Sequence, residues 1–506
     1  MIGGLKHTGY LAAVAAFCAM GPGVFLHQPA KAADLGGDCC ADLEDRVAEL
    51  EATTVRKGNK KVSIQIYGKV NYAVLTWNDG AETNTYTVNN YMESTRWGFK
   101  GSAKIAGDWS AGYRLEVEVR PAASSRLNQF DDNNAFDPNG ALNVRWSTMY
   151  LSNKTWGELR WGLTATPKYD ITKDAMEYIS TEPGEGGGLS DTLVPDFRMN
   201  DSFRLRQSGF DNAEGLSSLA WQNIARCYSA NDQFNCSTRR NGVAYWSPTW
   251  EGFSTQWGVY EDDMWGGAVR YRGSFAPFGG ATGLSKDDPW LFAASAAYEK
   301  ITDERLLQGA GGGAGFERDF DEWAGSAALK HKPTGLFIMG AWSISDSSDS
   351  NVNGIFNGEG APQMTAWDVQ GGVQRKLHWF GLDRLGDTAF WGGFSEVNDG
   401  FAPGSNPNST QICPVACQAG SLGVRANMLL PAGTFPGIGI NTQITDSNVD
   451  TWFLALDQQL EAASMHLYAV FEHFEGDVSL IDSGRNRVPL SIDDFNLGYV
   501  GGRLYF

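Results

Sequence analysis

The sequence has 506 residues and carries 40 Lys and Arg against 59 Asp and Glu, a formal net charge of −19 that argues against a nucleic-acid partner. It holds 61 Gly and 62 aromatic residues (18 Trp, 17 Tyr and 27 Phe) but only 18 Pro, and its mean hydropathy is −0.31 although 42% of its residues are hydrophobic. No stretch reaches the roughly 20 apolar residues of a membrane-spanning helix, so the composition favours a strand-rich protein with a wet rather than packed interior.

The first 32 residues have the three-part layout of a secretory signal peptide, with Lys6, an apolar run over 11–20 and small residues at 30–32. We therefore predict that residues 1–32 are a signal peptide cut after Ala32 and that the protein is exported. Cleavage removes two lysines and no acid, so the mature chain is more acidic still.

The segment 33–60 is predicted to be an N-terminal periplasmic extension with a short helix. The helix has the apolar spacing of a coiled coil at Leu43, Val47, Leu50 and Thr54. Two heptads are marginal alone, so the helix either packs with its copies in an oligomer or lies as a single amphipathic helix against the rest of the protein or cell-wall material.

Six cysteines remain after cleavage, an even number in an oxidising compartment. Two loop disulfides are predicted from close spacing, Cys227 with Cys236 and Cys413 with Cys417. The adjacent Cys39 and Cys40 can bridge to each other only through a strained ring, and pairing between chains is the alternative.

From Val62 onward apolar and polar residues alternate, which is the period of a β-strand. The pattern repeats to the C-terminus and gives sixteen strands long enough to cross a bilayer at a tilt. Short turns are expected near 107–108, 154–156, 248–251, 333–335 and 461–463, with longer ones near 276–288 and 379–387. Long loops are expected near 78–90, 122–142, 166–240, 301–319, 347–364, 398–450 and 476–491, with a brief one near 262–265.

The predicted fold class is all-β, a sixteen-stranded antiparallel transmembrane β-barrel over residues 61–506 with a short N-terminal periplasmic helix. The alternative is a soluble, secreted β-sandwich or propeller. Strand length, aromatic residues at strand ends and the alternation of short turns with long loops argue against it.

The stretch 112–120 indicates that the barrel is hollow. Its odd positions are apolar and its even positions, Arg114, Glu116, Glu118 and Arg120, are all charged. Four charges on one strand face would be costly in a packed core, so we expect them to line water.

Several motifs resemble the porins of α-proteobacteria, in the block Ala33-Asp34-Leu35-Gly36 with Cys39-Cys40 and the helix to Leu50, and in 96–101, 108–113, 143–151 and the terminal strand. The resemblance implies a sixteen-stranded, usually trimeric porin in the outer membrane of a Gram-negative bacterium. It implies contact with lipid and lipopolysaccharide, and a passive water-filled channel for small hydrophilic solutes and ions. Cell-wall contact would come through the N-terminal helix.

A barrel of this size is too wide to discriminate small solutes, so the loop of about 166–240 is expected to fold inward and narrow it. The acidic candidates on this loop are Asp170, Asp174, Glu177, Glu182, Glu185, Asp191 and Asp196. The basic candidates on the facing wall are Arg96, Lys100, Arg114, Arg120, Arg145 and Arg160. The resemblance singles out Arg96 and Arg145. Opposed charges would set a transverse field and the ion preference.

No constellation for catalysis is present. The four histidines left after cleavage match no zinc motif, and no nucleophile elbow or phosphate-binding loop occurs. We expect no enzyme activity, metal or cofactor. The alternatives to a general channel are a structural or adhesive surface barrel and a substrate-specific channel.

Overall fold

The computed structural model describes residues 61–119, 121–129, 142–180, 203–206, 216–221, 224–225, 239–261, 263–274, 288–302, 320–347, 363–377, 384–400, 442–482 and 487–506. The predicted signal peptide 1–32, the segment 33–60 with its expected helix, and every cysteine lie outside these residues.

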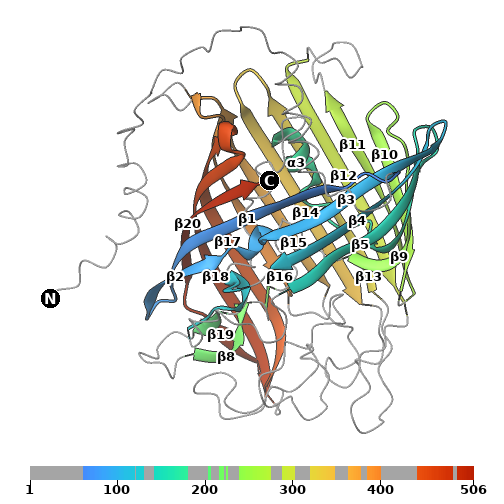
Figure 1. Ribbon diagram of the computed structural model, residues 1–506. Helices are drawn as coiled ribbons and strands as arrows, with labels where there is room; N and C mark the ends of the chain where they lie inside the picture. Colours follow the sequence, from blue (N-terminus) through green and yellow to red (C-terminus); the bar gives the residue numbers. More distant parts are fainter. Residues whose placement is uncertain are drawn as a thin grey trace, which may run out of the picture.

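Antiparallel strands form one sheet that closes on itself, because β1 pairs with β20 (Figure 1). In chain order its strands are β1 (Gln65–Asn78), β2 (Thr83–Asn89), β3 (Arg96–Ala106), β4 (Trp109–Val119), β5 (Leu142–Asn153), β6 (Gly157–Ala165), β9 (Arg239–Trp246), β10 (Phe253–Tyr260), β11 (Met264–Ser274), β12 (Trp290–Ile301), β13 (Phe320–His331), β14 (Leu336–Ser347), β15 (Met364–Arg375), β16 (Thr388–Asn398), β17 (Thr442–Leu460), β18 (Met465–Asp482), β19 (Arg487–Ser491) and β20 (Phe495–Tyr505).

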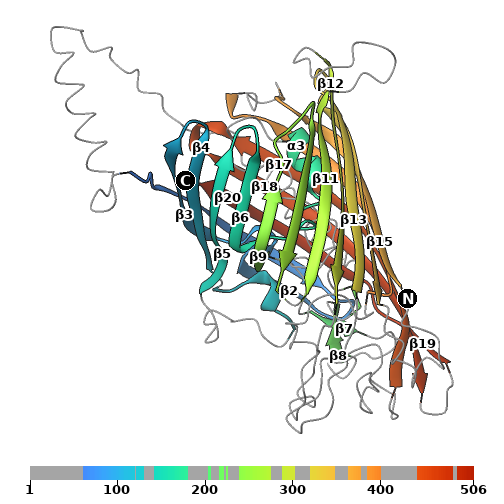
Figure 2. The same cartoon turned by 90° about the vertical axis from the view of Figure 1, so that its right-hand side faces the viewer.

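The barrel wall is sixteen strands around. β2 and β3 lie end to end along β1, and β19 and β20 lie end to end along β18. Each of these two pairs therefore occupies a single strand position, and the eighteen strands fill sixteen positions. The prediction of a closed, sixteen-stranded antiparallel barrel is confirmed. Figure 2 shows the tilted strands side by side.

The two edges of the sheet meet beside the last residue. Gly68 N–H donates to the Phe506 carbonyl at 2.9 Å, and Phe506 N–H donates to the Gly68 carbonyl at 3.0 Å. A Cβ on Gly68 would lie 2.5 Å from Cζ of the Phe506 ring and 2.6 Å from the Arg96 carbonyl oxygen. Only glycine therefore lets the C-terminal aromatic ring lie over the seam.

Two of the expected long loops are wrong. The range 78–90 holds β2, and the range 476–491 holds the end of β18 and β19, so both are hairpins that extend the sheet beyond the other strands. β2 escapes the strand pattern because Thr83, Thr85 and Thr87 supply its exposed face. β17 also begins at Thr442, inside the expected loop 398–450.

The outer face of the barrel exposes large apolar side chains at alternate positions. They include Ile66, Val74, Val144, Trp257, Val259, Ile338, Phe390 and Leu454. A continuous apolar exterior on so many strands is stable only against lipid. No helix among the described residues is long and apolar enough to cross a membrane.

One half of the interior is packed. The inner faces of β14 to β18, β20 and β1 carry the buried cluster Trp77, Phe337, Met339, Trp391, Phe453, Val470, Phe474, Phe495 and Leu497. Met176 and Ile179 of α3 (Asp174–Ser180) and Phe203 and Trp221 of the same long loop complete it. The expectation of a wet interior is therefore wrong for this half, because average hydropathy does not record which apolar residues a loop brings inside.

Candidate functional site

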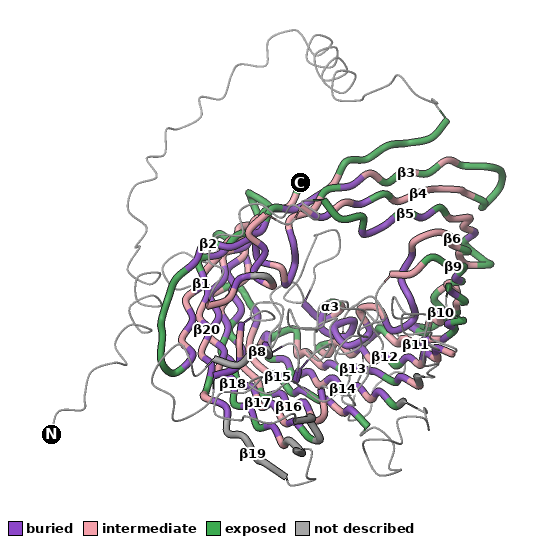
Figure 3. The backbone as a smooth tube through the Cα atoms, turned by 90° about the horizontal axis from the view of Figure 1, so that it is seen from below, coloured by how far each residue is buried: buried purple, intermediate pink, exposed green. Residues whose placement is uncertain are grey.

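The long loop after β6 turns into the barrel at once. Backbone hydrogen bonds of 3.0–3.1 Å between residues three apart wind 166–173 into successive tight turns. Asp170 takes φ +60°, a left-handed conformation that Asp tolerates better than most residues. α3 follows, and Figure 3 shows it inside the ring of strands.

Lys168 fastens this segment to the barrel wall. Its Nζ lies 2.6 Å from Glu322 Oε2 on β13, and its backbone N–H donates to Glu299 Oε1 on β12 at 2.5 Å. The lysine is 0% exposed. A buried charge that is paired in this way holds the loop, because separating the pair would leave charge without water.

Small side chains on β12 and β13 make room for the loop. The Ile171 carbonyl accepts hydrogen bonds from Ser295 Oγ at 2.9 Å and Ser326 Oγ at 2.7 Å. The Ile171 side chain packs in a cluster with Ala268, Ala297 and Ala324. Because the inward positions that face Ile171 are Ala and Ser, the loop can lie directly on the wall there.

A β-bulge on β5 turns two consecutive side chains inward. Glu116 pairs with Trp146 and the next residue of β4 pairs with Val144, so Arg145 is the extra residue. Arg145 Nε lies 2.9 Å from Glu116 Oε1, and its Nη1 lies 2.6 Å from Glu118 Oε2. Both Arg145 and Trp146 are buried.

The other arginines of this wall share the same carboxylates. Arg96 forms an ion pair with Glu93 and places Nη1 3.6 Å from Glu116 Oε1. Arg114 places Nη2 2.7 Å from Glu116 Oε2, and its Nε donates to Tyr67 Oη at 2.8 Å. Three arginines from three strands therefore meet at one glutamate.

Glu116 and Glu118 correct the expectation drawn from the stretch 112–120. They are 2% and 0% exposed, so their carboxylates are surrounded mainly by protein rather than by open water, although Glu116 borders the cavity described below. Arginines neutralise them instead, because a buried carboxylate needs a paired cation. The wall is thus a mixed network and not a purely basic surface.

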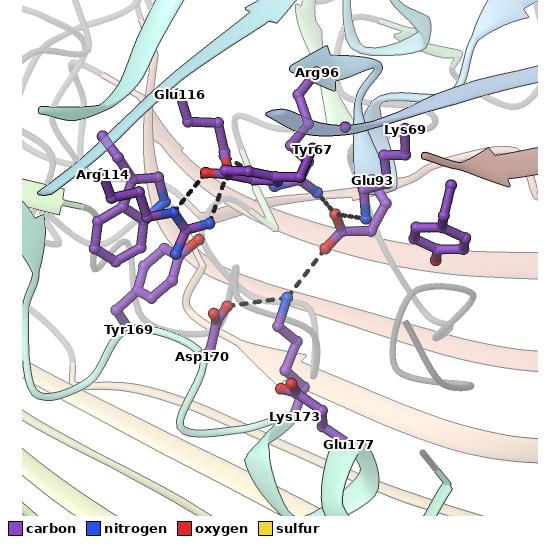
Figure 4. Close-up of a pocket in the computed structure, with 13 residues that line it drawn as sticks. Tyr67, Lys69, Glu93, Arg96, Arg114, Glu116, Tyr169, Asp170, Lys173 and Glu177 are labelled. Carbon is purple, nitrogen blue, oxygen red and sulfur yellow. Dashed lines mark hydrogen bonds and ion pairs between the residues drawn. The ribbon is translucent and has the colours of Figure 1, made fainter. Parts of the chain in front are cut away.

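The loop meets this wall across a cavity of about 300 Å³ (Figure 4). Lys173 Nζ lies 3.2 Å from Glu93 Oε1 and 3.0 Å from Asp170 Oδ1. Lys69 on β1 lies 2.7 Å from the same Glu93. The charged residues that line the cavity are Lys69, Glu93, Arg96, Arg114, Glu116, Asp170, Lys173 and Glu177.

Two further predicted bases lie on the same wall. Lys100 Nζ stands 5.1 Å from the centre of the Tyr67 ring. The Arg160 guanidinium stands 4.1 Å from the centre of the Trp246 ring and forms an ion pair with Glu158. Neither Lys100 nor Arg160 lines the cavity.

The predicted loop acids separate into two groups. Asp170 and Glu177 line the cavity opposite the wall arginines. Asp174 instead forms an ion pair with Arg272 and lies 3.5 Å from Arg270 Nε, both on β11. It therefore anchors α3 to its supporting wall. The candidates outside the described residues are Arg120, Glu182, Glu185, Asp191, Asp196, Cys227, Cys236, Cys413 and Cys417.

Sequence reasoning missed several residues of this network. They are Tyr67, Lys69, Glu93, Trp146, Lys168, Tyr169, Lys173, Arg270 and Arg272. Lys69 stands on the polar side of an alternating strand and could have been found. Glu93 and Lys173 carry no such signal, because they lie between strands, where sequence alternation gives no direction.

Residues 29–479 match the family model of the Gram-negative porins. The chain belongs to the Gram-negative porin family. The porin is thus an outer-membrane protein whose barrel forms a passive diffusion channel for small hydrophilic solutes and ions. Family and fold point to a channel rather than an enzyme.

Solved structures similar to this porin include the anion-selective porin from Comamonas acidovorans, at 15% identity over 88% of this chain and 100% of that chain, with a TM-score of 0.48. OmpT, an outer membrane protein of Vibrio cholerae, shows 10% identity over 89% and 99% of the two chains, with a TM-score of 0.44. Salmonella typhi OmpF in complex with daunomycin shows 12% identity over 89% and 99%, with a TM-score of 0.42. No curated protein sequence matches this porin.

The long loop of the porin also contacts the opposite wall. Phe203 packs 5.0 Å from Phe495, and Trp221 packs 5.9 Å from Phe474, measured between ring centres. β7 (Arg204–Arg206) pairs with β8 (Leu216–Ala220) beside these contacts, at the same end of the barrel as β19 (Figure 1; Figure 2). One loop therefore packs on both sides of the channel, against β12 and β13 and against β18 and β20.

Proposed function

We propose that the aperture of this channel lies between residues 166–180 and the inner wall of β1, β3, β4 and β5. The observation that carries the proposal is the cavity at which loop and wall charges meet. Ion preference would then follow from Arg96 and Arg114 on the wall and from Asp170 and Glu177 on the loop. Arg145 is not part of the cavity lining and would act through its ion pairs with Glu116 and Glu118.

The mixed charge of the aperture favours weak ion selectivity. Each wall arginine has a carboxylate neighbour, so the wall has little net charge despite its many bases. The net charge of −19 is a poor guide here, because permeation depends on the few groups at the narrowest point.

Two substitutions in planar bilayers test the aperture. Arg114 and Asp170 have partly exposed side chains, at 37% and 29%, so Arg114→Gln and Asp170→Asn should fold. Arg114→Gln should move the reversal potential toward cation preference, and Asp170→Asn should move it toward anion preference. Wild-type reversal potentials in both variants would place the aperture elsewhere.

A substrate-specific channel is the second candidate. The packed half of the interior narrows the route, and the rings of Tyr67, Trp146 and Tyr169 line the cavity beside the charges. This candidate predicts conductance that one solute blocks at low concentration. A folded but electrically silent protein would instead favour a structural or adhesive barrel.

We propose a homotrimer close to the α-proteobacterial porins, on the motif block at residues 33–50 and the Arg96 and Arg145 motifs. Light scattering of the detergent complex tests the trimer. Contact with the cell wall through segment 33–60 and the two loop disulfides stay predictions. Cosedimentation with peptidoglycan and the mass change on thiol alkylation test them.

A further inference from the structure

Lys173 is a cation on the side of the aperture where acids were expected. It belongs to the loop, and its ammonium reaches across to Glu93, an acid of the wall segment η1 (Tyr91–Glu93), at 3.2 Å. In this contact the loop supplies the cation and the wall supplies the acid, which is the reverse of the predicted arrangement of loop acids and wall bases. Both side chains are 7% exposed, so the pair is nearly closed to water.

Glu93 does not depend on Lys173 alone. Lys69 Nζ lies 2.7 Å from its Oε2, and Arg96 forms an ion pair with the same oxygen. The wall therefore keeps a neutralised Glu93 when Lys173 is removed. Replacing Lys173 therefore leaves Glu93 with two cations that belong to the barrel.

The charges around the cavity balance. Among the described residues, four basic and four acidic side chains line it, and Lys173 is the one basic residue that residues 166–180 contribute. Losing the lysine would leave an excess of one negative charge at the narrowest point. Because low-dielectric walls strengthen charge effects there, one charge is enough to change ion preference.

We infer that Lys173 is a specificity-determining residue of the channel and that its ion pair with Glu93 is a strut closing one side of the aperture. The inference rests on the proposed function, because it requires residues 166–180 to form the constriction. Loop and wall are joined where the pair stands, so solutes pass only beside it. Without the strut, the space on both sides of it becomes one wider opening.

The test compares single-channel conductance and reversal potential of protein purified from outer membranes. Lys173→Gln should raise conductance and should raise the cation-to-anion permeability ratio about twofold. Lys173→Arg should keep both values near wild type, because it restores the cation. Lys300→Gln is the matched control, since Lys300 has a similar acid partner, Asp321 at 3.5 Å, at the outward positions of β12 and β13.

Glu93→Gln provides a second arm. It removes the same strut from the wall side, so conductance should rise while the permeability ratio shifts toward anions. Wild-type conductance or a wild-type permeability ratio in Lys173→Gln would overturn the inference. If Lys173→Gln behaves like wild type while Arg114→Gln shifts the reversal potential, the inference about Lys173 fails and the proposed aperture stands. If Arg114→Gln and Asp170→Asn are also silent, the proposed aperture has failed with it.

Discussion

Arg145 on β5 places Nη1 2.6 Å from Glu118 Oε2 on β4, and the two side chains are 8% and 1% exposed. The bulge that inserts Arg145 is what turns it toward β4, since strict alternation would send either it or Trp146 to the lipid. The pair therefore depends on an irregularity of the sheet. Arg145 adds one more cation to a part of the wall that carries two buried carboxylates, Glu116 and Glu118.

Replacing Arg145 should weaken the barrel more than replacing a base outside this network. Arg145→Gln removes the ion pairs that the guanidinium makes with Glu116 and Glu118, which costs on the order of 3 kcal/mol for a buried pair. Arg160→Gln is the control, because its pair with Glu158 is partly exposed and worth about 1 kcal/mol or less. Urea unfolding in detergent measures both, and equal losses would contradict the prediction.

Lys168 should limit the current noise of the open channel. Lys168→Met removes the loop's ion pair with Glu322, so we expect residues 166–180 to move and open-channel noise to increase severalfold. Lys300→Met is the control, because Lys300 pairs with Asp321 at 3.5 Å at the outward positions of β12 and β13. Noise at the wild-type level in Lys168→Met would show that the other loop contacts suffice.

Overpacking the wall behind the loop should displace it. Ala324 is 0% exposed and packs with Ile171, so Ala324→Leu should cost about 1–3 kcal/mol or push the loop into the aperture and lower conductance. Ala327→Leu, three residues along β13 on the exposed face, should change neither property. Conductance and urea unfolding of the two variants give the comparison.

Asp399, just after β16, should make stability depend on pH. Burial, with help from the carboxylate of Asp446, raises the pKa of Asp399 from 3.8 to about 6. The folded protein thus holds this proton more tightly than the unfolded chain, so the stabilisation is complete below pH 3.8 and is lost as pH rises through about 6.

Asp399→Asn should remove this dependence while keeping the hydrogen bond that Ser447 N–H donates to Oδ1 at 3.2 Å. Unfolding midpoints of wild type and variant should therefore diverge as pH rises through about 6, with the variant the more stable. Asp346→Asn, on an exposed residue at the end of β14, is the control. Parallel pH profiles for wild type and Asp399→Asn would contradict the prediction.

Strand alternation was enough to predict the barrel. Each membrane strand must turn apolar side chains to lipid, so the period of two persists along the chain. It predicts the sixteen strands of the barrel and the closing strand that ends at Phe506. The same alternation predicted that the side chains of Arg96 and Arg114 point into the barrel. It failed for β2, where threonines cover the exposed face, and for Trp146, which a bulge turns inward.

By itself, the sequence determined the fold, the membrane and the inward side of most strands, because these follow from one repeated local pattern. Only the tertiary structure decided which charges meet. Lys173 and Glu93 lie 80 residues apart in irregular segments, and Lys168 finds Glu322 across 154 residues. No local rule fixes such pairs. They depend on where the loop packs, and the Ala and Ser face of β12 and β13 sets that position.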